Sequence, residues 1–293
     1  MSKRSEFMST LDFEVSKKPL FVQLGEQNVQ KCNDKVAIIN ESTNQVLSYM
    51  SPNYRLFNNE EFMDLAGRIS DNLGLELDHY NSYKGGKKVL AAFKQTDKKH
   101  TLCGYDFENH IVLYDGRDGS TCLSIGSIGY LNRCANMFTS MRSQERKGNV
   151  LKINHSSKLD EMLADFEASL EIYGAMQQQT LERIERLNDI KVSQKNLYSL
   201  IGGWTQLTAE EVRNVAYGNY DTDDVSTRKK NIVDGLVNSW SIESAELGQN
   251  GFALHNTLTH YMTHKRNKSE NDVLFADFGK KELQTIQFAE ALV

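Results

Sequence analysis

Alternating apolar and polar positions dominate the first half of the chain. This two-residue period, together with β-branched and aromatic residues, is typical of half-buried strands. It predicts strands at residues 35–40, 45–49, 75–80, 89–93, 110–114 and 120–125. Turn-forming residues separate them, most clearly Gly85 and Gly86 and the stretch 115–119 with its two Asp-Gly pairs. The pattern therefore predicts an antiparallel meander of hairpins.

A helical period of apolar residues appears first between residues 60 and 72, where Phe62, Leu65 and Ile69 share one face. Asn59 is a suitable N-cap, and Gly74 a suitable glycine just beyond the C-terminal end. A longer stripe starts at Leu159 and predicts a helix of about thirty residues, broken near Gly174, that packs against a core. Shorter helices are predicted at residues 208–217, 228–245 and 250–266.

These elements predict an α+β fold, in which an antiparallel β-meander or hairpin sheet packs on a long helix and a helical C-terminal part follows. We divide the chain into a loosely held N-terminal arm (1–34), a core of sheet and long helix (35–200), a helical part (201–266) and a mobile tail (267–293). The tail ends in an amphipathic apolar stretch that contains Leu283, Ile286 and Leu292.

Composition places the chain among ordinary globular proteins, with 293 residues, 39% hydrophobic and 25% charged. No stretch approaches the ~18–20 consecutive apolar residues of a membrane helix, and the N-terminus lacks the apolar region of a signal peptide. The four cysteines form no CxxC pair. These features predict a reducing cytoplasm and no contact with a membrane.

Charge is distributed unevenly along the chain, although the net value is only −5. Residues 84–158 carry 13 basic and 6 acidic residues, whereas 1–83 carry 8 and 12, and 159–293 carry 13 and 21. A basic block of this size suggests a surface that meets phosphate. The alternative is that the acidic flanks fold back and neutralise the block, because segregation along the sequence need not survive folding.

Nine basic residues in this block are the predicted nucleic-acid contacts: Lys84, Lys87, Lys88, Arg117, Arg133, Arg142, Arg146, Lys147 and Lys152. The first three surround a Gly-Gly pair, where the backbone can approach a phosphate closely, although the P-loop pattern is absent. Tyr130 and Phe138 are interleaved with the later ones and would either stack on bases or lie in the core.

Candidate catalytic and metal-binding residues form two groups. His255, His260 and His264 are spaced about one helical turn apart, but the HExxH pattern is missing. Asp115 and Asp118, with Asp106 and Glu108 nearby, could hold Mg²⁺, although Asp-Gly pairs are far more often turns. No nucleophile or dinucleotide motif is present. We predict no cofactor and no metal site, and we leave open whether the chain is an enzyme.

Several short motifs occur in a recognisable order: Tyr54-Arg55, Gly85-Gly86-Lys87-Lys88-Val89, Asp115-Gly116-Arg117-Asp118-Gly119-Ser120, Arg133-Cys134-Ala135-Asn136, Ile153-Asn154-His155-Ser156, and Asn256, Thr259 and His264. This order resembles the phage and plasmid family known as domain of unknown function 932, over roughly residues 35–265. The resemblance implies a mobile-element protein in the cytoplasm of a bacterial host cell and brings no settled chemistry.

A weaker resemblance is architectural. A hairpin sheet followed by one long helix is similar to the core of single-strand annealing proteins of the RecT and Redβ type, which carry DNA in a basic groove and assemble as rings or filaments. This resemblance implies a homo-oligomer that binds single-stranded nucleic acid and promotes annealing. Two alternatives stay open: a metal-dependent enzyme acting on nucleic acid or nucleotides, and a host-interaction or anti-defence protein that uses its acidic C-terminal third.

Overall fold

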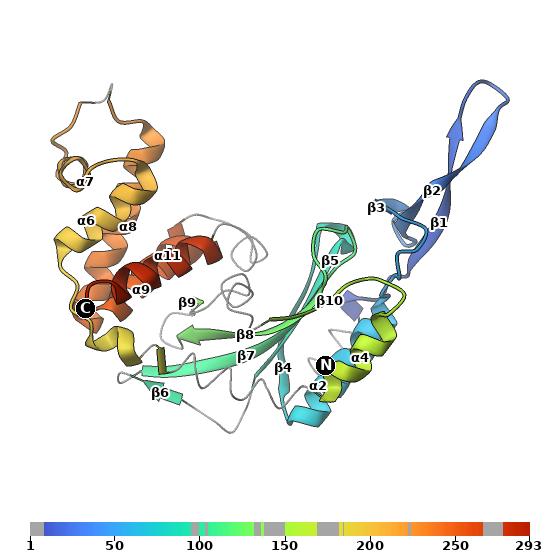
Figure 1. Cartoon of the computed structure of the whole chain (residues 1–293), viewed down its shortest axis with the longest axis horizontal. Coiled ribbons are helices and arrows are strands. Elements are labelled where there is room, and N and C mark those ends of the chain that lie inside the picture. The colour runs from blue at the N-terminus through green and yellow to red at the C-terminus, as the bar shows by residue number, and fades with distance from the viewer. Residues whose placement is uncertain are drawn as a thin grey trace. The chain divides into compact units, whose positions relative to one another are not determined.

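The computed structural model of the chain describes residues 9–94, 100–102, 105–131, 136–137, 150–168, 182–183, 185–221, 224–265 and 278–293 (Figure 1). The chain forms two compact units. Unit 1 comprises residues 1–98, 109–127 and 148–175, and unit 2 comprises residues 99–108, 128–147 and 176–293. No helix in the described residues is long and apolar enough to cross a membrane.

A three-stranded antiparallel sheet begins unit 1, in the order β1 (Val15–Gln23), β2 (Val29–Asn40) and β3 (Gln45–Met50). The two predicted strands at 35–40 and 45–49 are confirmed. The prediction of a loosely held arm was wrong for residues 15–34, because β1 pairs with β2 along its whole length as a long hairpin (Figure 1). Its sparse apolar residues hid this hairpin, since many of them lie on exposed positions.

The hairpin is irregular at its middle. Pro19 pairs with Val36, whereas the next residue, Leu20, pairs with Cys32, so residues 33–35 of β2 have no partner in β1. Proline fits such a position because it cannot donate to the ladder. This bulge divides the hairpin into a base and an outer half, which we call the arm: residues 20–23 of β1, residues 29–32 of β2 and the turn between them.

The base of the hairpin has a small hydrophobic core of its own. Val15, Ile38, Leu47 and Tyr54 are buried there. Polar contacts then hold this sheet against the rest of unit 1: the Asn40 side-chain amide donates to the Gly85 carbonyl at 3.1 Å. The base is therefore packed, while the arm has exposed positions on both faces.

The larger sheet is antiparallel, as predicted, with the order β10-β8-β7-β5-β4. Its strands are β4 (Glu76–Tyr83), β5 (Lys88–Lys94), β7 (Tyr105–Gly116), β8 (Leu123–Leu131) and β10 (Val150–Ile153). Two short strands extend it: β6 (His100–Leu102) pairs with β7, and β9 (Asn136–Met137) pairs with β8. A 3-10 turn, η1 (Lys84–Gly86), joins β4 to β5.

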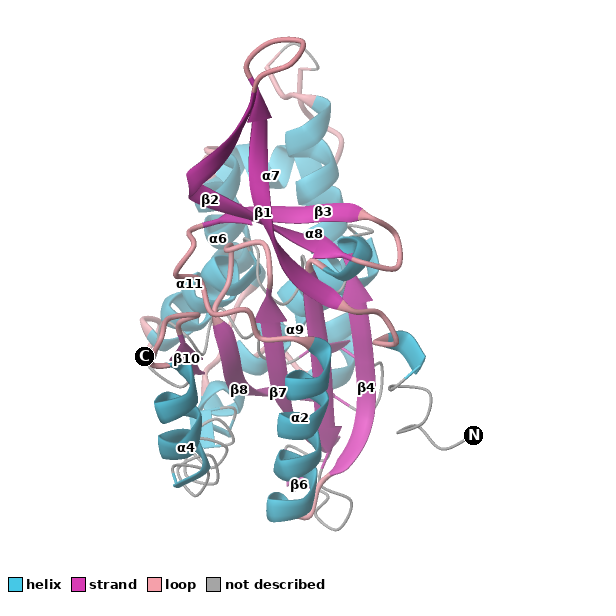
Figure 2. Cartoon of the chain, turned by 90° about the vertical axis from the view of Figure 1, so that its right-hand side faces the viewer, coloured by secondary structure: helices cyan, strands magenta, loops and turns pink. Residues whose placement is uncertain are grey.

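Two helices of unit 1, α2 (Asn59–Leu73) and α4 (Leu159–Ala168), lie on one face of this sheet (Figure 2). The N-cap of α2 is Asn58 rather than the predicted Asn59, and Gly74 ends the helix in the left-handed conformation as predicted. Residues 169–181, which the sequence assigned to one long helix with α4, lie outside the described residues.

Unit 2 contributes the helical C-terminal part that the sequence predicted. Its helices are α6 (Gln194–Thr205), α7 (Ala209–Ala216), α8 (Thr227–Leu247), α9 (Gly251–His260), the π-helical turn η2 (Tyr261–Lys265) and α11 (Phe278–Glu290). The α+β fold class is thus confirmed. The prediction of a mobile tail was wrong for α11, which packs on α9 with Ile286 and Ala289 buried. Those apolar residues form a core contact rather than a free amphipathic end.

Candidate nucleic-acid interface and buried polar cluster

The structure separates the nine predicted nucleic-acid contacts. Lys84 and Lys152 are exposed and Lys87 is half-buried, so these three can reach a ligand. Lys88 is buried, and Arg117 is fully buried, so the structure does not present these two side chains at the surface. Arg133, Arg142, Arg146 and Lys147 lie outside the described residues.

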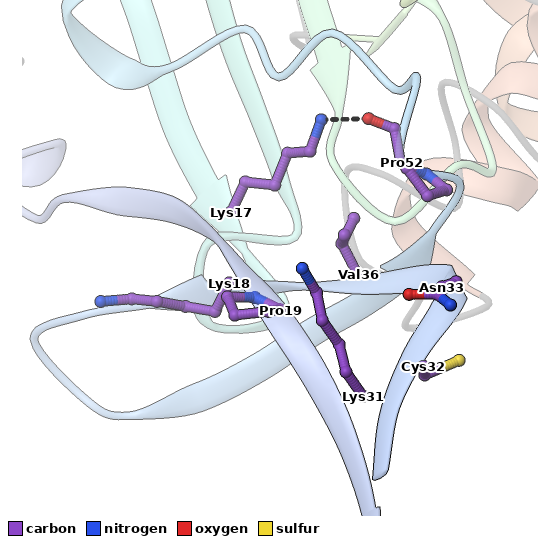
Figure 3. Close-up of a pocket in the computed structure, with 8 residues that line it drawn as sticks. All are labelled: Lys17, Lys18, Pro19, Lys31, Cys32, Asn33, Val36 and Pro52. Atoms are coloured by element: carbon purple, nitrogen blue, oxygen red, sulfur yellow. Dashed lines mark hydrogen bonds between the residues drawn. The ribbon is translucent and has the colours of Figure 1, made fainter.

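A groove lies at the bulge of the β1–β2 hairpin, where sequence reasoning placed no site. It has a volume of about 360 Å³ and is open to solvent. Its lining residues come from both strands and from the segment after β3: Lys17, Lys18, Pro19, Lys31, Cys32, Asn33, Val36 and Pro52 (Figure 3). The bulge creates the groove because the three unpaired residues of β2 bend the hairpin away from a flat ribbon.

Three lysines give this lysine groove a positive charge. Lys17 donates to the carbonyl oxygens of Pro52 and, at 3.1 Å, of Tyr54, which orient its ammonium without neutralising it. Lys31 is exposed, and its ammonium makes no hydrogen bond or ion pair with any described residue. Lys18 is paired with Glu41 at 2.7 Å. The hydrogen bond to Glu41 raises the pKa of Lys18. Glu41 neutralises Lys18, whereas the charges of Lys17 and Lys31 remain uncompensated by any described carboxylate.

A second polar feature of unit 1 is buried. Asp115 lies near the C-terminal end of β7, and Arg117 directly follows that strand. Both side chains are fully inaccessible to solvent. The Asp115 carboxylate lies 2.8 Å from His155 Nε2 and 3.9 Å from Arg117 Nε. The other ring nitrogen of His155 donates to the Arg55 carbonyl at 3.0 Å, and the Tyr54 ring stacks on the imidazole at 4.8 Å.

The electrostatics of this buried cluster favour a charged histidine. A backbone carbonyl can only accept, so Nδ1 carries a proton, and an ionised Asp115 makes Nε2 a donor as well. Burial disfavours the imidazolium, but the hydrogen bond and charge of Asp115 outweigh it and raise the pKa of His155. Burial lowers the pKa of Arg117 and raises that of Tyr54.

The buried cluster connects segments that are distant in sequence. Arg117 donates to the Gly86 carbonyl at 3.3 Å, and its own carbonyl accepts from Ser48 at 2.7 Å. Asp115, which the sequence treated as a turn residue or a Mg²⁺ ligand, instead pairs with Val89 in the sheet and binds His155. The cluster can hold a proton and fix the β7–β8 turn against η1 and β3.

Unit 2 contains two histidine–glutamate contacts, of which His255–Glu282 is buried and His260–Glu243 is partly buried. His260 Nδ1 lies 2.7 Å from Glu243, and His255 Nε2 lies 3.4 Å from Glu282 of α11. The rings of His260 and His264 meet edge to face at 5.0 Å. Within the described ranges, no three histidine, cysteine or acidic side chains are grouped so that they could share a metal ion.

Comparison with known protein families matches residues 46–286 to the domain of unknown function 932 (DUF932). The chain belongs to this family. Neither the curated proteins nor the solved structures include a match to the sequence or the fold. The DUF932 region therefore begins within β3 and covers parts of both units, whereas Lys17 and Lys31 of the lysine groove precede it.

The motifs that carried the DUF932 resemblance converge in the structure. Tyr54, Arg117 and His155 come from three of these motifs and surround Asp115. Asn256 and Thr259 are fully buried in α9. The sequence indicated these residues by motif order alone. The lysine groove left a weaker signal, the Lys17-Lys18-Pro19 stretch, which becomes meaningful only once the β1–β2 register is known.

Proposed function

We propose that this DUF932 protein binds single-stranded DNA and promotes annealing as a homo-oligomer in a phage or other mobile element. The observation that carries the proposal is the lysine groove, where the ammonium groups of Lys17 and Lys31 lie at the surface without an ion pair to any described carboxylate. Uncompensated ammonium groups attract phosphates and release the counterions bound to them. Exposed Lys84 and Lys152 add positive charge to the same unit.

The architecture supports this function in a second way. An antiparallel meander with helices on one face carries a projecting two-stranded hairpin, so a rigid sheet supports a narrow element that bears the lysine groove (Figure 2). Annealing requires that the strand is held by its backbone while its bases stay accessible. A lysine groove on a hairpin meets that requirement, because its contacts are directed at phosphates and do not depend on base sequence.

The test is the anisotropy of a labelled single strand of about 30 nucleotides across a salt series, with a duplex of equal length for comparison. We expect tight binding to the single strand that weakens steeply with salt. Replacing Lys17 and Lys31 by glutamine should lower the log–log slope by about 1–2, since each phosphate contact on a single strand contributes about 0.7. Fluorescence resonance energy transfer between two complementary labelled strands would report annealing.

The matched control replaces two exposed lysines of unit 2, Lys191 and Lys195, by glutamine, which changes the net charge by the same amount. Its slope should equal that of the wild type. An Arg142/Arg146/Lys147 triple alanine variant tests the basic residues that lie outside the described part. A wild-type protein that binds no strand at low salt would refute the proposal, and co-purification with one host protein at fixed stoichiometry would then favour the host-interaction alternative.

A further inference from the structure

The arm beyond the bulge carries an aromatic residue next to a basic one. Phe21 pairs directly with Lys31 in the β1–β2 register. Directly opposed residues of an antiparallel pair project from the same face, with Cβ atoms about 5 Å apart. The next opposed pair, Gln23 and Val29, lies on that face as well. One face of the arm therefore presents a ring, an ammonium group and an aliphatic side chain side by side.

This face continues into the lysine groove. Lys31 lines the groove together with Lys17 (Figure 3). It is also the cross-strand partner of Phe21. A strand whose phosphate is bound by Lys31 would thus pass the Phe21 ring, the cross-strand neighbour of that lysine. The juxtaposition matches the two chemical parts of a nucleotide, an anionic phosphate and a flat apolar base.

The arm has no core that would explain its apolar residues. Phe21 is 55% exposed and Val29 60%, and Val22 and Leu24 are also exposed. A two-stranded hairpin is marginally stable by itself, and large apolar side chains on its surface mark an interaction site more often than a structural one. The four lysines and two acidic residues of 15–40 give the hairpin a positive charge, which favours a polyanion over an apolar protein surface.

We infer that Phe21 is a stacking platform for a base of the strand whose phosphate lies in the lysine groove, with Lys31 shared between the two contacts. The inference rests on the proposed function and names the part of the ligand that the arm recognises. Stacking on an aromatic ring tolerates any base, because every base has a π-face. The arm therefore adds affinity for unpaired bases without adding sequence preference, and a duplex, whose bases are already stacked, gains nothing from it.

The experiment compares two labelled strands of equal length and phosphate number, one with normal bases and one with abasic sites throughout its central part. Phe21→Ala should weaken binding to the normal strand by about 5- to 100-fold and leave the abasic strand nearly unchanged. Its salt slope should equal that of the wild type. Lys31→Gln should weaken binding to both strands and lower the slope.

Val22→Ala is the matched control, because Val22 is the neighbour of Phe21, is 46% exposed and projects from the opposite face. It should bind both strands like the wild type. Phe21→Trp should preserve the preference for the normal strand, and 2-aminopurine placed in that strand should be quenched on binding. Because Phe21 is exposed, none of these changes disturbs a core, and unchanged unfolding curves would verify this.

The outcomes separate the inference from the proposed function. If the wild type binds neither strand, the proposed function is wrong and the inference with it. If the wild type binds both strands with a steep salt dependence and Phe21→Ala loses no preference for the normal strand, only the inference is overturned. If the arm instead binds a second copy of the chain, sedimentation should give a lower molecular mass for Phe21→Ala than for the wild type. The variant should then lose equal affinity for the normal and the abasic strand.

Discussion

At the scale of single residues, the clearest energetic consequences come from burial of Asp115, Arg117 and His155 in one place. Moving charges out of water is costly, and the cost is offset only when each charge has a partner. Asp115 serves both cations here, so the cluster depends on that one carboxylate. Replacing Asp115 would leave the cations Arg117 and His155 buried without this opposite charge. Asp115 therefore contributes to the packed interior and is more than a turn-forming residue.

The protonation of His155 should make stability depend on pH. Its folded-state pKa lies above the ordinary value of 6.5, so the charged ring stabilises the fold fully below about that pH. This contribution is lost as the pH rises through the raised pKa. We expect the free energy of unfolding by urea to fall over that range in the wild type, and to fall less in His155→Gln.

The difference between the two proteins isolates His155 from other titrating groups. Glutamine keeps a hydrogen-bonding amide near Asp115 and carries no ionisable proton. Parallel pH profiles for the wild type and His155→Gln would contradict the assignment of a charged imidazole. The same measurement on Lys158→Gln, an exposed position three residues away, should follow the wild type throughout.

At the scale of elements, the turn η1 explains the Gly85-Gly86 pair better than a phosphate contact does. Both glycines have positive φ, +70° and +97°. A Cβ on Gly86 would lie 2.6 Å from the Phe13 ring, which packs on the core at the base of the hairpin. The pair therefore allows the β4–β5 connection to approach the small sheet closely, and the neighbouring Lys84 and Lys87 remain accessible.

Gly86→Ala should destabilise unit 1 by roughly 1–3 kcal/mol, because it adds a steric overlap to an unfavourable backbone conformation. Chemical denaturation would measure the loss. Gly25→Ala is the control: no atom lies within 4 Å of its added Cβ and its φ is not positive, so its free energy of unfolding should change by less than about 0.5 kcal/mol. Equal values for the two variants would mean that η1 adapts to a side chain.

Helix α11 shows what a periodic pattern leaves undecided. The apolar positions Ile286 and Ala289 indicated an amphipathic segment, which we assigned to a mobile tail from the sequence. Periodicity identifies a face that prefers to be buried, but it does not name the partner. The partner is α9, and Glu282 of α11 meets His255 of α9 in the buried contact.

At the scale of the whole molecule, each of the two units buries large apolar side chains. In unit 2, Phe252 of α9 packs against Phe107 with ring centroids 5.8 Å apart, and both rings are buried. In unit 1, Phe62 and Ile69 of α2 are buried. The chain passes between the units more than once, since β7 and β8 each contribute residues to both. The two units therefore unfold either independently or as one cooperative unit, and hydrogen exchange distinguishes these two cases.

Phe252→Ala should lower the free energy of unfolding of unit 2 by about 3–5 kcal/mol, as expected for removal of a buried aromatic ring. We expect native-state hydrogen exchange to accelerate in α8, α9 and α11, while amides of α2 and β5 keep their protection, because the lost contacts belong to unit 2. Ile69→Ala should give the reverse pattern. Acceleration by the same factor in every element, for both variants, would show that the chain unfolds as one cooperative unit.

The distribution of charge over the surface could not be inferred from the distribution of charge along the sequence. The block 84–158 contains the basic excess, yet Arg117 and Lys88 within it are buried. The lysine groove comes instead from residues 17–31, in a block where acidic residues outnumber basic ones. Net charge of a segment is a sum along the chain, whereas a ligand meets only the charges that folding leaves uncompensated at one surface.

The sequence by itself determined the α+β class, most strands of the meander, the ends of α2 and the membership in DUF932, because each depends on short-range periodicity, capping residues or motif order. Tertiary structure alone decided that Tyr54, Asp115, Arg117 and His155 meet, that α11 packs on α9, and that a bulge brings Lys17, Lys31 and Phe21 together. Those outcomes depend on strand register and on contacts between residues far apart in sequence, such as His155 and Arg55, which are 100 positions apart. Local propensity carries no information about such pairings.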